Sequence, residues 1–257
     1  MFDQLPLPME SDARLTALHN ILLLKFGQQR DGVRFDPNSQ LINAMLSSET
    51  RDEISTRVFR KLWDTYYPFW GGLADCCPIE LAWFIRDVTH ADVKARQIVE
   101  AVRMIQKSQG RFELSFLADW PIDAAMAWLQ QLPGVGPKIS TATLNFSDLR
   151  KRVLVVDRHV LRITQRVGFV PHNADTRKAL RILMRMVSLT STADDLYELH
   201  WLIKMQSQKT CHLTGPDCER CPISPTCAFG RPADKHSSSA SPRKRASSAL
   251  ASQLLLV

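Results

Sequence analysis

Four cysteines near the end of the chain place the strongest constraint on its fold. Of the six cysteines in the sequence, these four lie within 17 residues in the pattern C-x6-C-x2-C-x5-C: Cys211, Cys218, Cys221 and Cys227. Thiolates this close together can wrap one metal centre, which is either Zn²⁺ or an iron–sulfur cluster. Structural zinc sites usually carry two separated CxxC knuckles. Since this segment has a single CxxC flanked by longer gaps, its spacing favours a [4Fe–4S] cluster over one zinc ion.

Apolar residues recur at helical spacing along most of the chain. One stripe of period 3.6 runs from Leu15 to Phe26 and ends at Gly27. Similar stripes predict about ten helices. Only residues 153–156 resemble a strand, and four residues cannot form a sheet. The sequence therefore predicts an all-α protein.

The length and charge of the chain narrow the class of protein. At 257 residues it fits one large domain or two small ones. The formal net charge is +7, but over half of this excess lies in the serine-rich stretch after Gly230. The basic balance alone is therefore weak evidence for nucleic-acid binding. That stretch has too little apolar content to fold alone, so residues 231–257 are predicted to form a disordered basic tail.

The sequence lacks the usual signals for membrane insertion and export. No apolar run approaches the roughly 20 residues that a membrane span needs. The first residues do not form a basic region followed by an apolar stretch, so we do not expect secretion. We expect a cytoplasmic protein, associated with the nucleoid if the chain is bacterial.

A short turn between two predicted helices carries the first functional signal. It reads Gln-Leu-Pro-Gly-Val-Gly-Pro-Lys over residues 131–138, with Leu132, Gly134, Val135 and Gly136 in the turn. The two glycines allow a sharp turn and the close approach of a partner, and a proline begins the second helix. Unpaired N–H groups at the start of that helix would face outward and bind phosphate. The segment is either an ordinary turn or a helix–hairpin–helix that holds a DNA backbone without reading its sequence.

Further motifs complete a family resemblance. Val-Val-Asp-Arg-His-Val-Leu-Arg at residues 155–162 follows the hairpin, and His-Trp-Leu-Ile at 200–203 precedes the cysteines. Together with the hairpin and its lysine, this order resembles the endonuclease III family of the helix–hairpin–helix DNA glycosylase superfamily. The resemblance covers roughly residues 15–230, and it is specific because the motifs recur in the same order at similar spacing.

The resemblance implies catalytic roles for two residues. Lys138 would attack the sugar C1′ and form a Schiff base, while Asp157 would help deprotonate the attacking group and stabilise the positive charge at C1′. An amine attacks only when neutral, so the pKa of Lys138 must lie below the exposed value of about 10.4. Burial in a cleft and the positive end of a helix would both lower it. Without such roles, Lys138 is a solvated first-turn lysine and Asp157 a helix N-cap.

The resemblance also implies two helical domains that flank a cleft. A six-helix domain would span residues 32–150 and carry the hairpin, and a cluster domain would combine residues 1–31 with 151–230. A [4Fe–4S] cluster on the four cysteines would shape a DNA-contacting loop without taking part in cleavage. Double-stranded DNA with a damaged or abasic nucleotide would lie across the cleft with the lesion turned out of the stack. The protein is expected to be a monomer.

Two positions depart from the family pattern. Typical members read LLSAQATD where this chain has Met-Leu-Ser-Ser-Glu-Thr-Arg-Asp at residues 45–52. Glu49 therefore replaces the glutamine that fills the gap left by the flipped nucleotide, and His90 replaces an apolar wedge residue in a second loop. A carboxylate near phosphates needs protonation or a partner, for which Arg51 is a candidate. Glu49 and His90 are either DNA-binding residues or ordinary surface residues of loops that have moved.

Three functions compete for these motifs. We expect a DNA glycosylase with AP lyase activity that removes damaged, oxidised pyrimidines and cleaves the abasic site by β-elimination. A monofunctional uracil or mismatch glycosylase is the second possibility, but members without lyase activity generally carry another residue in place of Lys138. A non-catalytic DNA-binding iron–sulfur protein is the third, and the presence of both Lys138 and Asp157 argues against it.

Overall fold

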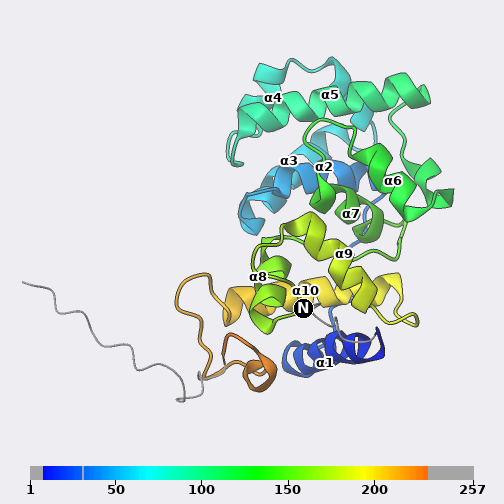
Figure 1. The fold of residues 1–257 in the computed structure, drawn as a ribbon. Coiled ribbons are helices and arrows are strands. Elements are labelled where there is room, and N and C mark those ends of the chain that lie inside the picture. Colours follow the sequence, from blue (N-terminus) through cyan, green and yellow to red (C-terminus); the bar gives the residue numbers. More distant parts are fainter. Residues whose placement is uncertain (1–7, 31, 231–257) are drawn as a thin grey trace, which may run out of the picture.

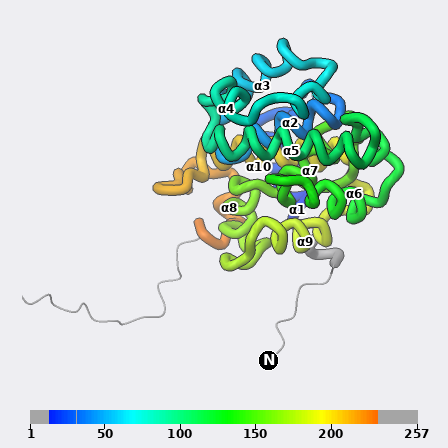
Figure 2. The backbone as a smooth tube through the Cα atoms, turned by 90° about the horizontal axis from the view of Figure 1, so that it is seen from above, coloured from blue at the N-terminus to red at the C-terminus, as the bar shows by residue number. Residues whose placement is uncertain are grey.

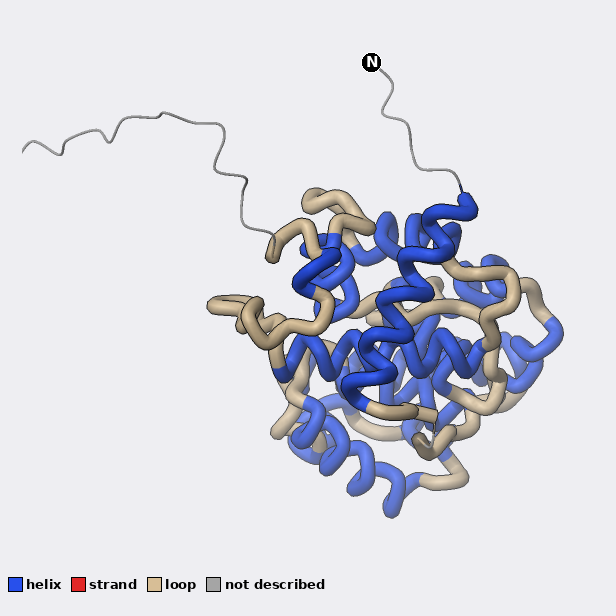
Figure 3. Tube along the Cα trace, turned by 90° about the horizontal axis from the view of Figure 1, so that it is seen from below, coloured by secondary structure: helices blue, strands red, loops and turns tan. Residues whose placement is uncertain are grey.

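The computed structural model describes residues 8–30 and 32–230, which fold into helices joined by short loops (Figure 1). This part of the chain contains no strand (Figure 3), which confirms the all-α prediction. The α-helices are α1 (Pro8–Phe26), α2 (Pro37–Ser47), α3 (Asp52–Tyr66), α4 (Pro78–Phe84), α5 (Ala91–Gln109), α6 (Ile122–Leu129), α7 (Pro137–Phe146), α8 (Arg158–Val167), α9 (Thr176–Met186) and α10 (Ala193–Lys209). Short 3-10 helices are η1 (Trp70–Asp75), η2 (Ser115–Asp119) and η3 (Ser224–Thr226).

The strand-like residues 153–156 form a buried connector between α7 and α8. All four side chains are at most 2% exposed. The only isolated β-bridge of the described residues lies elsewhere, between Phe35 and Ser147. The apolar run therefore fills the core without building a sheet, as its shortness predicts. The predicted tail at 231–257 lies outside the described residues.

The helices form two groups, which Figure 1 shows one above the other. Helices α2 to α6 lie in the upper group, and α1, α8 and α10 lie in the lower group. Helix α7 packs against α2 in the upper group and also contacts α9 and α10. Viewed from above, α5 lies over α2, and the loop after α10 is on the opposite side from α6 (Figure 2). This grouping follows the two expected domains, whose boundaries stay a prediction.

Helix α2 is positioned by its first turn and by its packing against α7. The Asp36 carboxylate accepts hydrogen bonds from the backbone N–H groups of Asn38 and Ser39, both at 3.0 Å. The apolar side chains of α2 are buried, and one face packs against α7. This packing brings Ser47, the last residue of α2, beside Lys138 in the first turn of α7.

The first helix is tied to α10 by a buried carboxylate. The Glu198 side chain is 1% exposed and accepts hydrogen bonds from the His19 ring and from the backbone N–H of Gln29, each at 3.0 Å. Arg30 adds an ion pair with Glu198 at 3.4 Å. A carboxylate with several donors can stay charged when it is buried. These contacts hold α1 in the lower group. Within the described residues, no helix is long and apolar enough to cross a membrane.

Candidate functional site

A cleft of about 670 Å³ opens between the two groups of helices. Its walls come from α2, the start of α3, the hairpin and α7, the start of α8 and the middle of α10. His90 lies outside it and lines a neighbouring pocket of about 150 Å³ that Glu49 also lines. The predicted site residues on the walls of the cleft are Lys138, Asp157, Glu49, Gly134 and Gly136.

The hairpin makes the sharp turn that its glycines predict. Gly134 has a φ of +77°, in the left-handed region that favours glycine. The Val135 N–H donates to the Leu132 carbonyl at 3.1 Å across the turn. The side chains of Leu132 and Val135 are only 4% and 5% exposed, so they anchor the hairpin in the core. Little of either predicted binding residue is therefore accessible from outside.

The start of α7 presents unused backbone donors. Gly136 is the N-cap of this helix and Pro137 is its first residue. Among the described residues, no acceptor is found for the backbone N–H groups of Gly136, Lys138 and Ile139. Free N–H groups at a helix start, with the helix dipole behind them, bind anions such as phosphate. The start of α7 thus has the free donors that the hairpin motif predicts, and phosphate binding there stays a prediction.

The Lys138 amine lies in the cleft where α7 meets α2. It donates a hydrogen bond to Ser47 Oγ at 3.2 Å. Burial lowers the pKa of Lys138 to about 8; the Asp157 carboxylate opposes this shift and the Lys204 ammonium adds to it. An exposed lysine, with a pKa of about 10.4, is almost wholly charged near neutral pH. A useful fraction of the Lys138 amine is instead neutral there, as a nucleophile requires.

Asp157 combines a structural position with a charge that faces the cleft. Its Oδ1 accepts hydrogen bonds from the backbone N–H groups of His159 at 2.8 Å and Val160 at 2.9 Å, which caps α8. Its Oδ2 has no hydrogen-bond partner among the described residues. Burial would raise the pKa of Asp157, but His200 and the Val160 N–H lower it more, so the net shift is downward. The N-cap role and a charged catalytic role are therefore compatible.

Three polar residues of the cleft were not singled out by the sequence: Ser47, Asp52 and Lys204. Lys204 donates to Asp52 Oδ1 at 2.7 Å. A signal existed for Lys204, because it lies four residues after His200 and so on the same face of α10. Asp52 and Ser47 belong to the motif that contains Glu49. Only the fold reveals that these segments meet.

Glu49 and His90 face each other from two loops. Both have left-handed backbones, with φ of +55° and +58°, which non-glycine residues adopt rarely and often at functional sites. His90 Nε2 lies 3.6 Å from Glu49 Oε2, and the side chains are 64% and 71% exposed. Glu49 therefore pairs with His90, and the suggested pairing with Arg51 is wrong. The two residues are close together and accessible from outside.

Lys94 of α5 holds the two loops in place. Its buried ammonium donates to the Leu46 carbonyl at 2.8 Å and to Thr50 Oγ1 at 2.9 Å. Thr50 Oγ1 also accepts a hydrogen bond from the backbone N–H of Thr89 at 3.2 Å. One hydroxyl thus joins the loop that carries Glu49 to the loop that ends at His90.

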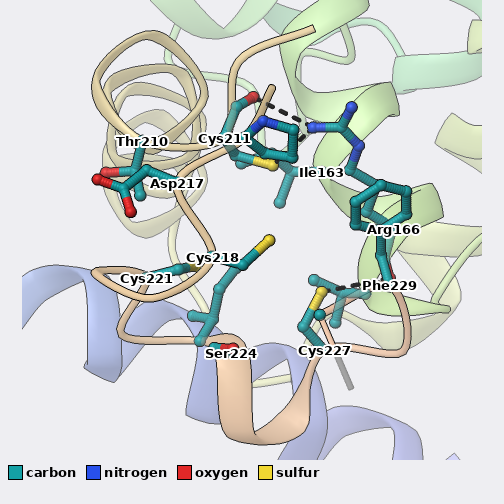
Figure 4. Close-up of a pocket in the computed structure, with 14 residues that line it drawn as sticks. Ile163, Arg166, Thr210, Cys211, Asp217, Cys218, Cys221, Ser224, Cys227 and Phe229 are labelled. Atoms are coloured by element: carbon teal, nitrogen blue, oxygen red, sulfur yellow. Dashed lines mark hydrogen bonds between the residues drawn. The ribbon is translucent and has the colours of Figure 1, made fainter. Parts of the chain in front are cut away.

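The four predicted cluster ligands surround a second, small cavity in the loop after α10. Cys211 and Cys227 are buried, and Cys218 and Cys221 are half-buried. All four line the cavity, and Figure 4 shows the sulfurs of Cys211, Cys218 and Cys227 turned toward its interior. The apolar side chain of Ile163 is also part of its wall. The fold thus gathers the thiols of a segment that has little helical structure of its own.

Nitrogen donors approach the cysteine sulfurs. Arg166 Nη1 lies 3.1 Å from Cys211 Sγ, and Gln206 Nε2 lies 3.3 Å from Cys221 Sγ. Such donors stabilise negative charge on sulfur and are typical of the surroundings of metal–thiolate centres. No three Cys, His, Asp or Glu side chains of the described residues converge as ligands of a single metal ion. The thiols instead line a common cavity.

Comparison with known sequences relates these features to one family. The model of the HhH-GPD superfamily of base excision DNA repair proteins matches residues 42–188. Endonuclease III of Thermotoga maritima is 30% identical over 200 residues, which cover 76% of this chain and 84% of that protein. Endonuclease III of Buchnera aphidicola is 26% identical over 78% of this chain and 86% of that protein.

Solved structures share the fold. A trapped endonuclease III–DNA covalent intermediate matches with a TM-score of 0.71 and 21% identity, over 85% of this chain and 96% of that one. A thermostable thymine-DNA glycosylase matches with a TM-score of 0.67 and 20% identity, over 86% and 97% of the two chains. At these identities the likeness describes the arrangement of helices alone.

An added methyl group should have different effects at the two hairpin glycines. In Gly134→Ala the left-handed backbone is strained and the new Cβ lies against the Gln97 side chain, so stability falls by about 1–2 kcal/mol. In Gly136→Ala the Cβ meets no atom within 4 Å, so stability stays within about 0.5 kcal/mol while affinity for duplex DNA drops. Urea unfolding and DNA titration measure the two effects. Unchanged DNA affinity of a folded Gly136→Ala protein would contradict phosphate binding at this turn.

Proposed function

Because the chain belongs to the endonuclease III family of HhH-GPD base excision DNA repair proteins, we propose that this DNA glycosylase is bifunctional. It removes oxidised pyrimidines from double-stranded DNA and then cleaves the strand at the abasic site by β-elimination. One observation carries the proposal: a partly neutral amine, Lys138, shares a cleft with a charged carboxylate, Asp157.

The hairpin and the cleft bind different parts of the damaged strand. The free N–H groups at the start of α7 hold a phosphate of the damaged strand, which fixes the backbone without reading its sequence. A base within the duplex is out of reach of an amine in a cleft, so the damaged nucleotide must rotate out of the stack. The cleft of about 670 Å³ has room for one nucleotide unit.

Chemistry begins when the neutral Lys138 amine attacks C1′ of the sugar. The C1′–N bond to the base breaks, and the base leaves with the bonding electron pair and takes up a proton. Asp157 stabilises the positive charge that develops at C1′. The new C–N link loses a proton, and the C1′–O4′ bond then breaks as O4′ keeps the bonding pair and takes up a proton, which leaves a Schiff base between C1′ and Lys138. Removal of a C2′ proton then expels the 3′-phosphate and breaks the strand, and water releases the enzyme.

A monofunctional glycosylase would use water as the nucleophile and would need no neutral lysine. Burying an ammonium group costs free energy unless it is paired or deprotonated. The cleft lowers the pKa of Lys138 to about 8 instead of fixing its charge with an ion pair. This arrangement favours the bifunctional enzyme over the monofunctional and the purely binding alternatives.

Glu49 and His90 are proposed to contact the strand opposite the lesion. They are exposed beside the cleft, and hydrogen bonds through Lys94 and Thr50 hold their loops. Strained left-handed backbones at both positions support a binding role over that of ordinary surface residues.

The four cysteines are proposed to hold a [4Fe–4S] cluster. All four line a shared space, two of their sulfurs receive N–H donors, and their C-x6-C-x2-C-x5-C spacing favours a cluster over zinc. Bound there, the cluster would supply the folding free energy of the loop at residues 210–230. It would lie apart from the Lys138 cleft and would be structural.

The cluster proposal predicts brown protein that contains iron and sulfide in equal amounts, with the broad visible absorption of iron–sulfur centres. Cys218→Ser should lose iron and make residues 210–230 sensitive to proteolysis, because metal binding there is coupled to folding. Cys77→Ser is the matched control, since Cys77 is an exposed thiol elsewhere, and it should keep its iron. Stoichiometric zinc without iron in anaerobically prepared protein would contradict the proposal.

The lyase proposal predicts a covalent adduct that depends on Lys138. Borohydride added during reaction with an abasic duplex should trap wild-type protein on DNA, and Lys138→Gln should abolish trapping and strand cleavage while it still binds the duplex. Asp157→Asn keeps a capping oxygen but loses the charge, so cleavage should fall by about 100-fold or more. The same assay on duplexes with an oxidised pyrimidine, with uracil or with a mismatched thymine identifies the base removed. Trapping of Lys138→Gln at the wild-type rate would show that another amine reacts.

A further inference from the structure

A second lysine lies on the wall of the same cleft. Lys204 comes from α10 in the lower group of helices, and its side chain is only 11% exposed. Its ammonium donates to Asp52 Oδ1 at 2.7 Å and lies 4.7 Å from the centre of the Trp201 ring. An ammonium over an aromatic face and beside a carboxylate is held in one position. Lys204 is therefore a fixed positive charge.

Asp52 and Gln208 fix this charge across the boundary between the two groups. Asp52 is the first residue of α3, in the upper group (Figure 1). Its second oxygen accepts a hydrogen bond from Gln208 Nε2 at 3.1 Å, one turn of α10 beyond Lys204. Both oxygens of the carboxylate are thus engaged by a single helix face. The pair therefore joins α3 to α10 along the cleft wall.

Charged and titratable groups approach Lys138 from every element around it. Their charges act in opposite directions on the amine, since carboxylates favour its charged form and cations favour its neutral form. Burial lowers the pKa of His200. The groups are Glu49 before α3, Asp52 at the start of α3, Lys94 on α5, Asp157, Arg158 and His159 at the start of α8, and His200 and Lys204 on α10.

We propose that Lys204 is a positioning residue of the reaction: its fixed charge favours the neutral, nucleophilic form of Lys138, and Asp52 holds it there and limits the effect. Two ammonium groups that share a partly buried cleft repel each other, and the freer one gives up its proton. Lys204 is bound to a carboxylate, whereas the one hydrogen-bond partner of Lys138 among the described residues is the Ser47 hydroxyl. Lys138 is therefore the group that becomes neutral.

The role of Lys204 in the reaction rests on the proposed lyase function, but its effect on the protonation of Lys138 is tested without DNA. An amine reacts with acetic anhydride only in its neutral form, so the pH dependence of labelling reports the protonation of each lysine. Labelling of the full-length, metal-loaded protein is read at the Lys138 peptide by mass spectrometry. The exposed Lys107 in the same digest serves as the internal reference for reagent concentration.

The variants separate an electrostatic role from a structural one. Lys204→Met and Lys204→Gln remove the cation, so the labelling midpoint of Lys138 should rise and its labelling at pH 7 should fall about threefold to tenfold. Asp52→Asn breaks the same ion pair but removes an anion, so the midpoint should move in the opposite direction. Lys204→Arg keeps the charge and should restore the wild-type midpoint.

If the labelling midpoint of Lys138 moved in the same direction in the Lys204 variants and in Asp52→Asn, the proposal would be overturned. An ion pair with a merely structural role predicts the same effect whichever partner is lost. An unchanged midpoint in both Lys204→Met and Lys204→Gln would overturn it as well. Failure of the lyase function gives a different signature. The wild-type protein would then fail to cleave an abasic duplex, whereas the labelling midpoint of Lys138 would still differ between the wild type and the Lys204 variants.

Discussion

The burial of one amine at the junction of α2 and α7 is the constraint on which the site depends. Desolvation disfavours the charged form of Lys138, and the Ser47 hydroxyl offers it a hydrogen bond but no counter-charge. The same helical turn carries the free N–H groups that suit phosphate. Phosphate binding and the nucleophile are thus joined by a few rigid backbone atoms, so a strand held at the hairpin is placed at a set distance from the amine.

Neither group of helices contains the whole site. The upper group supplies Lys138, Ser47 and Asp52, and the lower group supplies Lys204 on α10 and, at its boundary, Asp157 before α8. The charges that favour and disfavour protonation of the amine therefore come from different parts of the chain. The ion pair between Lys204 and Asp52 crosses the boundary between the two groups of helices. It therefore bears on the protonation of Lys138 as well as on stability. The cysteine loop packs against α8 and the end of α10, and its cavity shares no lining residue with the cleft.

Sequence patterns predicted the fold class and the hairpin turn, and the structure places Lys138 and Asp157 on the walls of one cleft, where their catalytic roles stay a prediction. Helical periodicity and glycine placement are local properties, and they do not depend on which helices later meet. The partner of Glu49 was predicted wrongly as Arg51, because a neighbour in sequence was the only candidate before His90 was known to face it across two loops. Ser47, Asp52 and Lys204 were missed for the same reason. Lys204 and Asp52 lie 152 residues apart, and their contact follows from packing that no local pattern encodes.

The central claim is that Lys138 acts as a neutral amine because the cleft lowers its pKa. The pH dependence of single-turnover strand cleavage on a saturating abasic duplex tests it directly, since this rate follows the fraction of neutral amine. The rate should rise about tenfold for each pH unit below the pKa of about 8 and level off above it. A rate that does not change between about pH 6 and 9, or that keeps rising toward the pKa of an exposed lysine at about 10.4, would contradict the account.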